Sequence, residues 1–219
     1  IVMAINKKHT FHGNNIDVDW HGNLCIHIGE CGKSEGDLFV RGRKPWCQPD
    51  LSTTDNVKDV ITRCPTGALS YTVKDGSRKE RCAPKNTITV SPNGPLYVQG
   101  DLSINGAAED MTGVQFRAAL CRCGKSDNKP FCDNNHVKDG FKDPGAVGSK
   151  GDLNSDEGGR LEVNPIENGP ILVTGNLDIH AGSGRKAWQG NKTALCRCGA
   201  SKSKPFCDGS HKNIEFVTD

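Results

Sequence analysis

Three cysteines and one histidine recur with the same close spacing at two places in the sequence. Both places read C-x-C-x2-S-x3-P-x-C-D-x2-H, at residues 121–136 and 196–211. Three soft thiolates and one imidazole suit either a tetrahedral Zn²⁺ ion or an iron-sulfur core. Zinc fingers and ribbons usually present two C-x2-C-like pairs, so this spacing favours two ligands on each of two irons, with zinc as the alternative. The predicted ligands are Cys121, Cys123, Cys132, His136, Cys196, Cys198, Cys207 and His211.

The histidine in each motif has two chemical consequences. A neutral imidazole in place of a thiolate removes one negative charge, so the reduction potential rises, as it does in Rieske centres. Acid competes with the metal for the ring nitrogen, so a solvent-facing His136 or His211 would make its cluster acid-labile. A metal site also contributes about 10 to 16 kcal/mol of apparent folding free energy. A purely structural role is therefore the alternative to redox function, and the two are compatible.

A third group of cysteines lies nearer the N-terminus. A C-x5-C pair and a remote Cys-Pro are similar to the ferredoxin pattern C-x2-C-x2-C followed by Cys-Pro. Ile28 stands where that pattern has its middle cysteine. Three thiolates suit a [3Fe-4S] core, and a [4Fe-4S] core is the alternative if Cys47 or His27 approaches a fourth iron. The predicted ligands of this site are Cys25, Cys31 and Cys64.

The two motifs belong to a longer internal repeat. The shift from Cys121 to Cys196, which is 75 residues, also carries the Asn-Gly-Pro sequence at 93–95 onto 168–170. Two similar modules therefore follow one another along the chain. The Gly-, Ser- and Asp-rich stretch 143–159 between them is predicted to be a flexible linker that lets the modules fold onto each other.

Short strands and one helix are predicted to position these ligands. Val57, Val60 and Ile61 follow the i, i+3, i+4 spacing of an amphipathic helix. Capping candidates at 52–55 precede this segment, and Pro65 ends it. In each module, apolar or alternating segments flank a turn that contains Asn-Gly, which is typical of short strands. The predicted strands are 87–90, 96–98, 161–163 and 171–173.

The composition indicates small domains stabilised by metal. Only 34% of the 219 residues are hydrophobic, which is low for one large core. Small domains of roughly 60 residues remove only about 60% of their surface from water, so metals or disulfides commonly stabilise them. The odd count of 11 cysteines argues against a closed disulfide framework. We therefore expect a reducing compartment, the cytoplasm.

Several function classes lack support in the sequence. No stretch approaches the roughly 20 apolar residues of a membrane span, and the secretory-signal pattern is missing. A formal net charge of +2 gives no reason to expect nucleic-acid binding. We find no nucleotide-binding fingerprint, no Ser-His-Asp arrangement and no carboxylate pair, so the protein is predicted not to be an enzyme.

The second motif, CRCGASKSKPFCDGSH at 196–211, resembles that of the CDGSH iron-sulfur domains, the mitoNEET-type proteins. The first, CRCGKSDNKPFCDNNH at 121–136, departs only where Asn-Asn replaces Gly-Ser, which leaves every ligand position intact. The resemblance covers about 86–216. It implies one [2Fe-2S] cluster per motif, with the C-x-C pair on one iron and the later cysteine and histidine on the other. It also implies a compact β fold whose two modules pack about a two-fold axis, here as a pseudo-dimer within one chain.

Residues 20–69, including Trp46 and the sequence CPTGAL, resemble a divergent single-cluster ferredoxin domain. This resemblance supports the three cysteine ligands and leaves the three- or four-iron core open. The expected fold class is α+β, with small metal-rich domains in which two mainly β modules form a pseudo-two-fold pair. The predicted divisions are a ferredoxin-like domain at 1–82, CDGSH modules at 83–145 and 161–219, and a linker at 146–160.

These features together predict an electron-transfer protein with two 3Cys-1His [2Fe-2S] clusters and one [3Fe-4S] or, alternatively, [4Fe-4S] cluster. A second hypothesis is cluster transfer, storage or redox and pH sensing through labile histidine-ligated clusters. A third is a zinc-stabilised interaction module. The expected partner is a redox protein or a cluster acceptor, with no nucleic acid and no membrane. We expect a monomer that contains an internal pseudo-dimer of CDGSH modules.

Two further groups of residues are expected to have structural roles and not functional ones. Arg197, Lys202 and Lys204 could form a basic rim for an acidic partner, but a solvated charged loop is favoured. Cys47 and Cys82 are expected to be small buried apolar residues.

Overall fold

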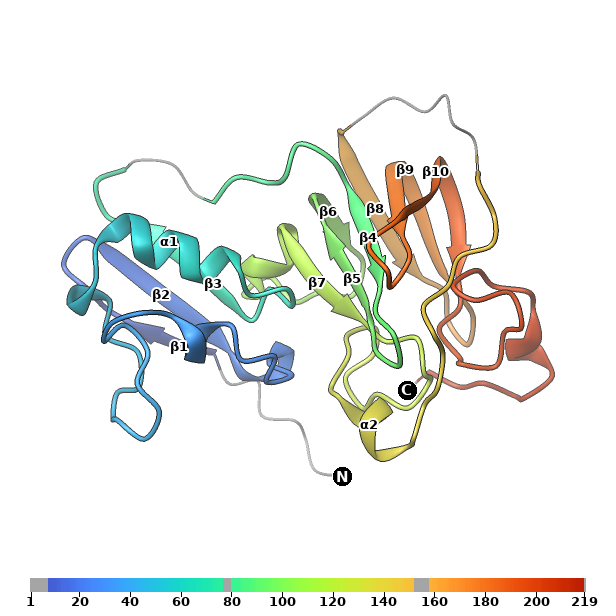
Figure 1. The fold of residues 1–219 in the computed structure, drawn as a ribbon, viewed down its shortest axis with the longest axis horizontal. Helices are drawn as coiled ribbons and strands as arrows, with labels where there is room; N and C mark the ends of the chain where they lie inside the picture. Colours follow the sequence, from blue (N-terminus) through green and yellow to red (C-terminus); the bar gives the residue numbers. More distant parts are fainter. Residues whose placement is uncertain (1–7, 77–79, 152–157, 219) are drawn as a thin grey trace.

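The computed structural model describes residues 8–76, 80–151 and 158–218 (Figure 1). Its strands form a three-stranded sheet of order β1-β2-β3 and a seven-stranded sheet of order β6-β8-β9-β4-β5-β7, with β10 on β9. None of the helices in these ranges is long and apolar enough to cross a bilayer. The helices and strands are β1 (Lys8–Phe11), β2 (Ile16–His21), α1 (Thr54–Thr62), β3 (Leu69–Val73), β4 (Thr87–Val90), β5 (Leu96–Gln99), β6 (Asp101–Ile104), β7 (Arg117–Leu120), α2 (Asn135–Lys138), β8 (Arg160–Pro165), β9 (Ile171–His180) and β10 (Lys186–Leu195).

The N-terminal domain combines the three-stranded antiparallel sheet with the helix α1. The hydroxyl of Thr53 accepts a hydrogen bond from the Asn56 amide at 3.3 Å, which satisfies a free amide of the first helical turn. The buried face of α1 packs against side chains of β2 and β3. This face consists of Val57, Val60 and Ile61, so the predicted helix is confirmed. The helix ends just before Cys64, which leads into the loop of the third predicted metal site.

The four strands predicted in the repeat are present as β4, β5, β8 and β9. β9 is longer than predicted and continues through Gly175, where φ is +124°. The equivalent residue of the first module, Gly100, has φ +149° and separates β5 from β6. A Cβ on Gly100 would lie 2.0 Å from the Asn86 side-chain oxygen, and a Cβ on Gly175 would lie 2.4 Å from the Arg160 carbonyl oxygen. Glycine is therefore required at both positions, where the chain passes from its own module to the other.

Each module contributes one strand to the other. The second half of β9 pairs in parallel with β4, with Ile88 opposite Ile179. β6 pairs in parallel with β8, with Ile104 opposite Val163. A shift of 75 residues converts Ile88 into Val163 and Ile104 into Ile179, so the same main-chain contact is made twice. The two modules thus share one sheet instead of packing as separate units.

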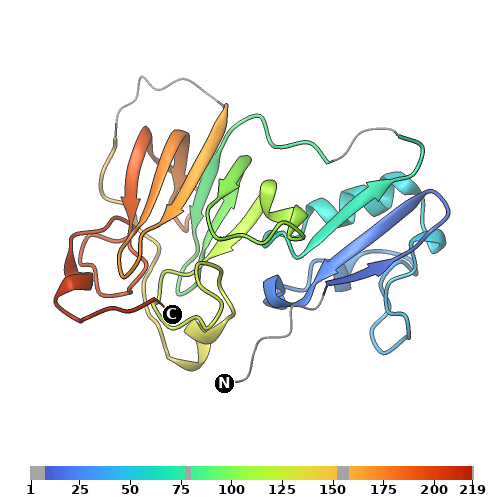
Figure 2. The same cartoon turned by 180° about the vertical axis from the view of Figure 1, so that it is seen from behind.

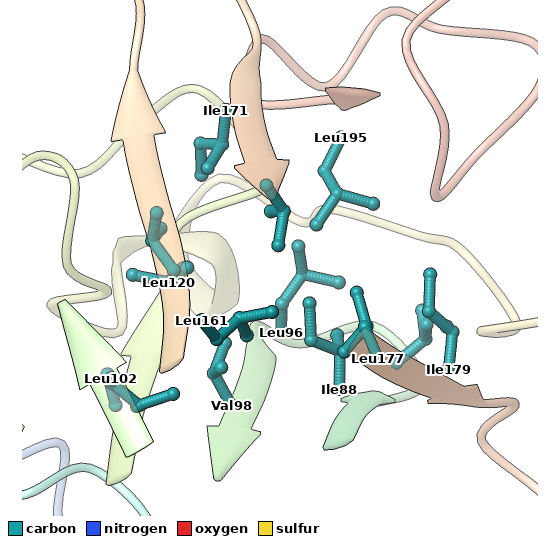
Figure 3. Close-up of a cluster of buried hydrophobic side chains, with 14 of the residues drawn as sticks. Ile88, Leu96, Val98, Leu102, Leu120, Leu161, Ile171, Leu177, Ile179 and Leu195 are labelled. Carbon is teal, nitrogen blue, oxygen red and sulfur yellow. The ribbon is translucent and has the colours of Figure 1, made fainter. Parts of the chain in front are cut away.

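One apolar core extends through both modules (Figure 3). Leucine, isoleucine and valine side chains from strands of the first and second modules pack together in it. Leu24 and Ala68 of the N-terminal domain belong to the same cluster. The modest hydrophobic content of the chain is therefore concentrated in a shared core. The side chains labelled in Figure 3 are Ile88, Leu96, Val98, Leu102, Leu120, Leu161, Ile171, Leu177, Ile179 and Leu195.

The described part of the predicted linker packs against the modules. Val147 is buried in the shared core, and the carbonyl of Gly145 accepts a hydrogen bond from the Gly182 amide at 2.9 Å. Gly151 forms an isolated parallel bridge with Gln189. Residues 152–157 lie outside the described residues. Residues 143–151 of the predicted flexible linker are thus held against the modules by the buried Val147 and by backbone contacts of Gly145 and Gly151.

Opposite views of the molecule show the order of its parts (Figure 1; Figure 2). The first module of the repeat lies between the N-terminal domain and the second module. The two motif-bearing loops project from the same end of the shared sheet.

Candidate metal centres

The first motif follows β7 and presents its four ligands in two pairs. The sulfurs of Cys121 and Cys123 are 3.7 Å apart, and the sulfur of Cys132 is 3.4 Å from Nδ1 of His136. Two sulfurs on one tetrahedral metal lie about 3.8 Å apart, and a sulfur and a nitrogen about 3.5 Å, given bond lengths of about 2.3 and 2.0 Å. Each pair therefore has the spacing of two ligands on one metal. All four side chains are buried.

The second motif repeats this arrangement after β10. The sulfurs of Cys196 and Cys198 are 3.8 Å apart, and the sulfur of Cys207 is 3.4 Å from Nδ1 of His211. Cys207 and His211 are only partly buried, whereas their counterparts in the first motif are buried. The cysteine-histidine half of the second site is therefore the more open to solvent.

The serine of each motif closes its loop. The hydroxyl of Ser126 donates to the Phe131 carbonyl at 2.6 Å, and that of Ser201 donates to the Phe206 carbonyl at 2.7 Å. Each bond joins the segment after the C-x-C pair to the residue just before the third cysteine. The serine therefore sets the separation of the two ligand pairs.

The aspartate of each motif orients the turn that leads to the histidine. Asp208 accepts hydrogen bonds from the Lys202 amide at 2.8 Å and from the amide and hydroxyl of Ser210. These bonds hold the pKa of Asp208 well below its usual value, and the bond from the Ser210 hydroxyl has the largest effect. Asp133 accepts equivalent bonds from the Asp127 and Asn135 amides. The carboxylate thus organises the loop and is not available as a metal ligand.

Asn134 occupies a position where the second motif has glycine. Its φ is +74°, and that of Gly209 is +87°. Asparagine tolerates the left-handed region better than most residues, so the departure from Gly-Ser keeps the backbone course. The Asn134 and Gly209 amides each donate to the sulfur of the preceding cysteine ligand at 3.4 Å. Burial raises the pKa of the Cys132 thiol to about 12, so its thiolate form requires a bound cation.

The arginine between the first two cysteines of each motif is buried. Arg122 donates to the Gly94 carbonyl at 2.7 Å and lies over the ring of Phe141 at 5.0 Å. Arg197 makes the matching contacts, with its guanidinium 5.6 Å from the centre of the Phe216 ring. The interpretation of Arg197 as part of a solvated loop is therefore wrong, since only 4% of it is exposed. These contacts explain why Asn-Gly-Pro and a later phenylalanine recur with the ligands.

The two CDGSH loops touch at their glycines. A Cβ on Gly124 would lie 2.6 Å from the Cys198 carbonyl oxygen, and a Cβ on Gly199 would lie 2.5 Å from that of Cys123. The backbones that carry the C-x-C pairs of the two sites are therefore in direct contact.

The three N-terminal cysteines line one cavity of about 660 Å³. His27 also lines it, with Nδ1 3.9 Å from the sulfur of Cys25. Within the described residues, no three Cys, His, Asp or Glu side chains surround one point as a single ion would require. An iron-sulfur core places each cysteine on a different iron, which matches ligands spread around a cavity. The three predicted ligands brought together here are Cys25, Cys31 and Cys64.

The other two N-terminal cysteines differ from each other. Cys47 does not line this cavity and is buried among apolar side chains, as expected. Burial raises the pKa of its thiol to about 12. Cys82 is exposed, so the expectation that it is buried is wrong. Of the two candidates for a fourth ligand, only His27 lies at the cavity.

A buried ion pair that no sequence motif indicates joins the N-terminal domain to the first module. Arg117, at the start of β7, pairs with Glu80, and both are buried. Arg117 also donates to the carbonyls of Cys64 at 2.8 Å and Leu69 at 3.1 Å. Burial raises the pKa of Glu80, and the guanidinium opposes that shift. No local pattern marks these residues, since Glu80 and Cys64 lie 37 and 53 positions from Arg117.

Comparison with protein families divides the chain in the same way. The family described as "Divergent 4Fe-4S mono-cluster" matches residues 11–74, and the family "Iron-binding zinc finger CDGSH type" matches 93–137 and 168–212. Two curated relatives, both called "Uncharacterized protein YjdI", come from Escherichia coli strain K12 and Escherichia coli O157:H7. Each is 44% identical over 59 residues, which is 27% of this chain and 78% of the relative. No solved structure matches the chain. The chain therefore consists of a divergent 4Fe-4S mono-cluster domain followed by two CDGSH-type iron-binding domains.

Proposed function

We propose that this protein transfers electrons through two [2Fe-2S] clusters, each on three cysteines and one histidine, and a third cluster in the N-terminal domain. The pairing of donors at 3.4 to 3.8 Å in both CDGSH loops carries the proposal. A lone zinc ion needs its four donors around one point, whereas a two-iron core needs two separate pairs. The iron-binding families matched by the chain support the same choice.

The two CDGSH modules are proposed to form a pseudo-two-fold pair within a monomer. The strand exchange supports this arrangement, because both parallel pairings have the same register after the 75-residue shift. The glycine contacts between the two loops are likewise reciprocal. The pair would thus be complete within one chain.

The third cluster is proposed to be held by Cys25, Cys31 and Cys64. Three cysteines alone suit a [3Fe-4S] core. His27 at the same cavity supports a fourth iron, as does the 4Fe-4S description of the matching family. His27 has φ +57°, a left-handed conformation that costs energy for residues other than glycine. This cost supports a functional role for the His27 side chain.

Replacing His27 by alanine is expected to convert the third cluster from [4Fe-4S] to [3Fe-4S]. Iron should fall from about eight to about seven atoms per chain, since each [2Fe-2S] core holds two. The oxidised protein should gain a paramagnetic resonance signal, because an oxidised three-iron core has an unpaired electron and an oxidised four-iron core has none. Ile28→Ala at the neighbouring cavity residue is the control and should change neither quantity. A wild-type protein that already shows the three-iron signal would contradict the role of His27.

Electrons are proposed to pass from the N-terminal cluster to the CDGSH clusters. Reduction potentials measured on the intact protein test this direction, and the N-terminal cluster should have the lowest of the three. The proposal includes no conversion of a bound substrate. Its external partners are one-electron redox proteins in a reducing compartment, the cytoplasm, in keeping with eleven free cysteines.

Cluster transfer is the second candidate function. The partial exposure of Cys207 and His211 supports it, because an acceptor protein or a proton can reach this half of the second site. The first site, with buried ligands, would then retain its cluster.

Metal analysis of the purified full chain tests the proposed function. Anaerobically purified protein should be coloured and should contain iron, inorganic sulfide and little zinc. A colourless protein with stoichiometric zinc would overturn the proposal. Mixing the loaded protein with an apo-ferredoxin then separates the two candidates: cluster movement faster than electron exchange would favour the carrier function.

A further inference from the structure

The N-terminal metal site faces the first CDGSH module. Cys25 and Cys64 pack against the apolar core that is shared with the modules, together with Leu24 and Ala68. Cys31 packs against the N-terminal domain's own core, and Cys64 packs against both cores. Two of the three cysteines therefore lie on the side of the first module.

A small apolar cluster joins the two metal sites. Ile26, next to Cys25, is buried against Ala119 and the ligand Cys132, and Tyr97 packs on the same cluster. The amide of Cys132 donates to the Ala119 carbonyl at 2.8 Å, so the cluster is continuous with the backbone of the first CDGSH loop. A side-chain amide of the same loop, from Asn128, donates to the Asn23 carbonyl at 2.8 Å.

Tyr97 lies on β5 of the first module and packs against Ile26 and Cys132. It stands opposite Ala119 in the pairing of β5 with β7. Two residues earlier on β7, Arg117 donates to the carbonyl of Cys64. One short stretch of these strands thus contacts ligands of both sites. Burial raises the pKa of Tyr97 to about 12, and the nearby Cys132 and Cys64 thiols add to this shift.

The second module has no equivalent of this aromatic side chain. The residue 75 positions after Tyr97 is Leu172, which stands opposite Ala194 in the matching strand pair. The second site instead contacts the first through Gly124 and Gly199. The first module also lies between the N-terminal domain and the second module (Figure 1; Figure 2).

We propose that Tyr97 is the electron-transfer bridge between the N-terminal cluster and the first CDGSH cluster. The three clusters then form a linear series in which the N-terminal cluster comes first and the second CDGSH cluster last. With clusters bound, the N-terminal cluster held by Cys25, Cys31 and Cys64 would give up one electron, and the cluster held by Cys121, Cys123, Cys132 and His136 would accept it. No bond forms or breaks, and the tyrosine stays in its closed-shell form. The partly exposed His211 end passes the electron to a protein acceptor. This inference rests on the proposed function.

Tyr97→Leu, which installs the residue of the second module, tests the bridge in the full chain. After rapid photoreduction, electron exchange between the N-terminal and first CDGSH clusters should slow by at least about tenfold, equivalent to about 1.4 kcal/mol of barrier. Iron and sulfide content and the three reduction potentials should not change. Tyr97→Phe, which keeps the ring, and Leu172→Ala, at the equivalent position, should both exchange at the wild-type rate. Exchange at the wild-type rate in Tyr97→Leu would overturn the bridge.

A second measurement tests the order of the clusters in the wild-type protein and does not depend on any variant folding. Reduction of the N-terminal cluster should accelerate the spin relaxation of the first CDGSH cluster more than that of the second. Stronger relaxation of the second cluster would overturn the linear order. Absence of the clusters from wild-type protein would overturn the proposed function itself, whereas intact clusters with the wrong order or an unaffected rate would overturn only this inference.

Discussion

Replacing His211 by cysteine is expected to lower the reduction potential of the second CDGSH cluster by about 100 to 300 mV. A thiolate adds one negative charge to the site, so an added electron is less stable. The same change should make the cluster more resistant to acid. In the wild type, a proton competes with the metal for Nδ1, the ring nitrogen that faces Cys207. A potential equal to that of the wild type would count against ligation by His211.

His136→Cys is the matched control for this experiment. The potential of the first cluster should fall by a similar amount, because the change in charge is the same. The gain in acid resistance should be smaller, because His136 is only 8% exposed and the wild-type first site is already protected from solvent. Spectroelectrochemical titration measures the potentials, and the loss of visible absorbance over time at about pH 5 measures the acid resistance. If the two sites of the wild-type protein were equally resistant to acid, the difference in histidine burial would not be the cause of acid resistance.

Replacing Arg117 by leucine is expected to lower the free energy of unfolding by about 3 to 5 kcal/mol. The change leaves the Glu80 carboxylate buried without its partner and removes hydrogen bonds to the Cys64 and Leu69 carbonyls. Because these contacts join the N-terminal domain to the first module, the loss should fall on their interface. Anaerobic urea unfolding followed by circular dichroism measures the effect.

Two variants show whether the unpaired charge causes this loss. Arg117→Leu combined with Glu80→Leu should recover most of the stability, since replacing a whole buried ion pair by apolar residues is often neutral. Arg160→Leu removes an exposed pair with Asp101, 3.9 Å apart, and should cost less than about 1 kcal/mol. A loss in Arg117→Leu no greater than in Arg160→Leu would contradict the proposed importance of the buried pair.

The predicted ligands of each CDGSH motif lie close together in the fold because each set lies within sixteen residues of sequence. The loop between Cys196 and His211 is closed by its own serine and aspartate, so the spacing of the ligands largely determines their geometry. The helix α1 was predicted for the same reason: its cap and its apolar spacing are both local.

Exposure of single side chains was harder to predict. Arg197 and Cys82 were assigned to the wrong environments, because burial depends on segments distant in the sequence. His27 and Cys47 were both candidates for a fourth ligand, and their spacing in the sequence gave no basis for choosing between them. Only the path of the folded chain brings His27 to the cavity and turns Cys47 into the apolar core.

The sequence by itself determined which residues are candidate metal ligands, how these candidates are grouped, and that the chain contains two repeated modules. Only the tertiary structure decided that the modules exchange strands, that Arg117 joins the N-terminal domain to the first module, and that Tyr97 packs against Ile26 and Cys132. The physical reason is separation along the chain. Alternating apolar residues specify which face of a strand is buried, but they do not specify its partner strand or register when that partner lies many residues away.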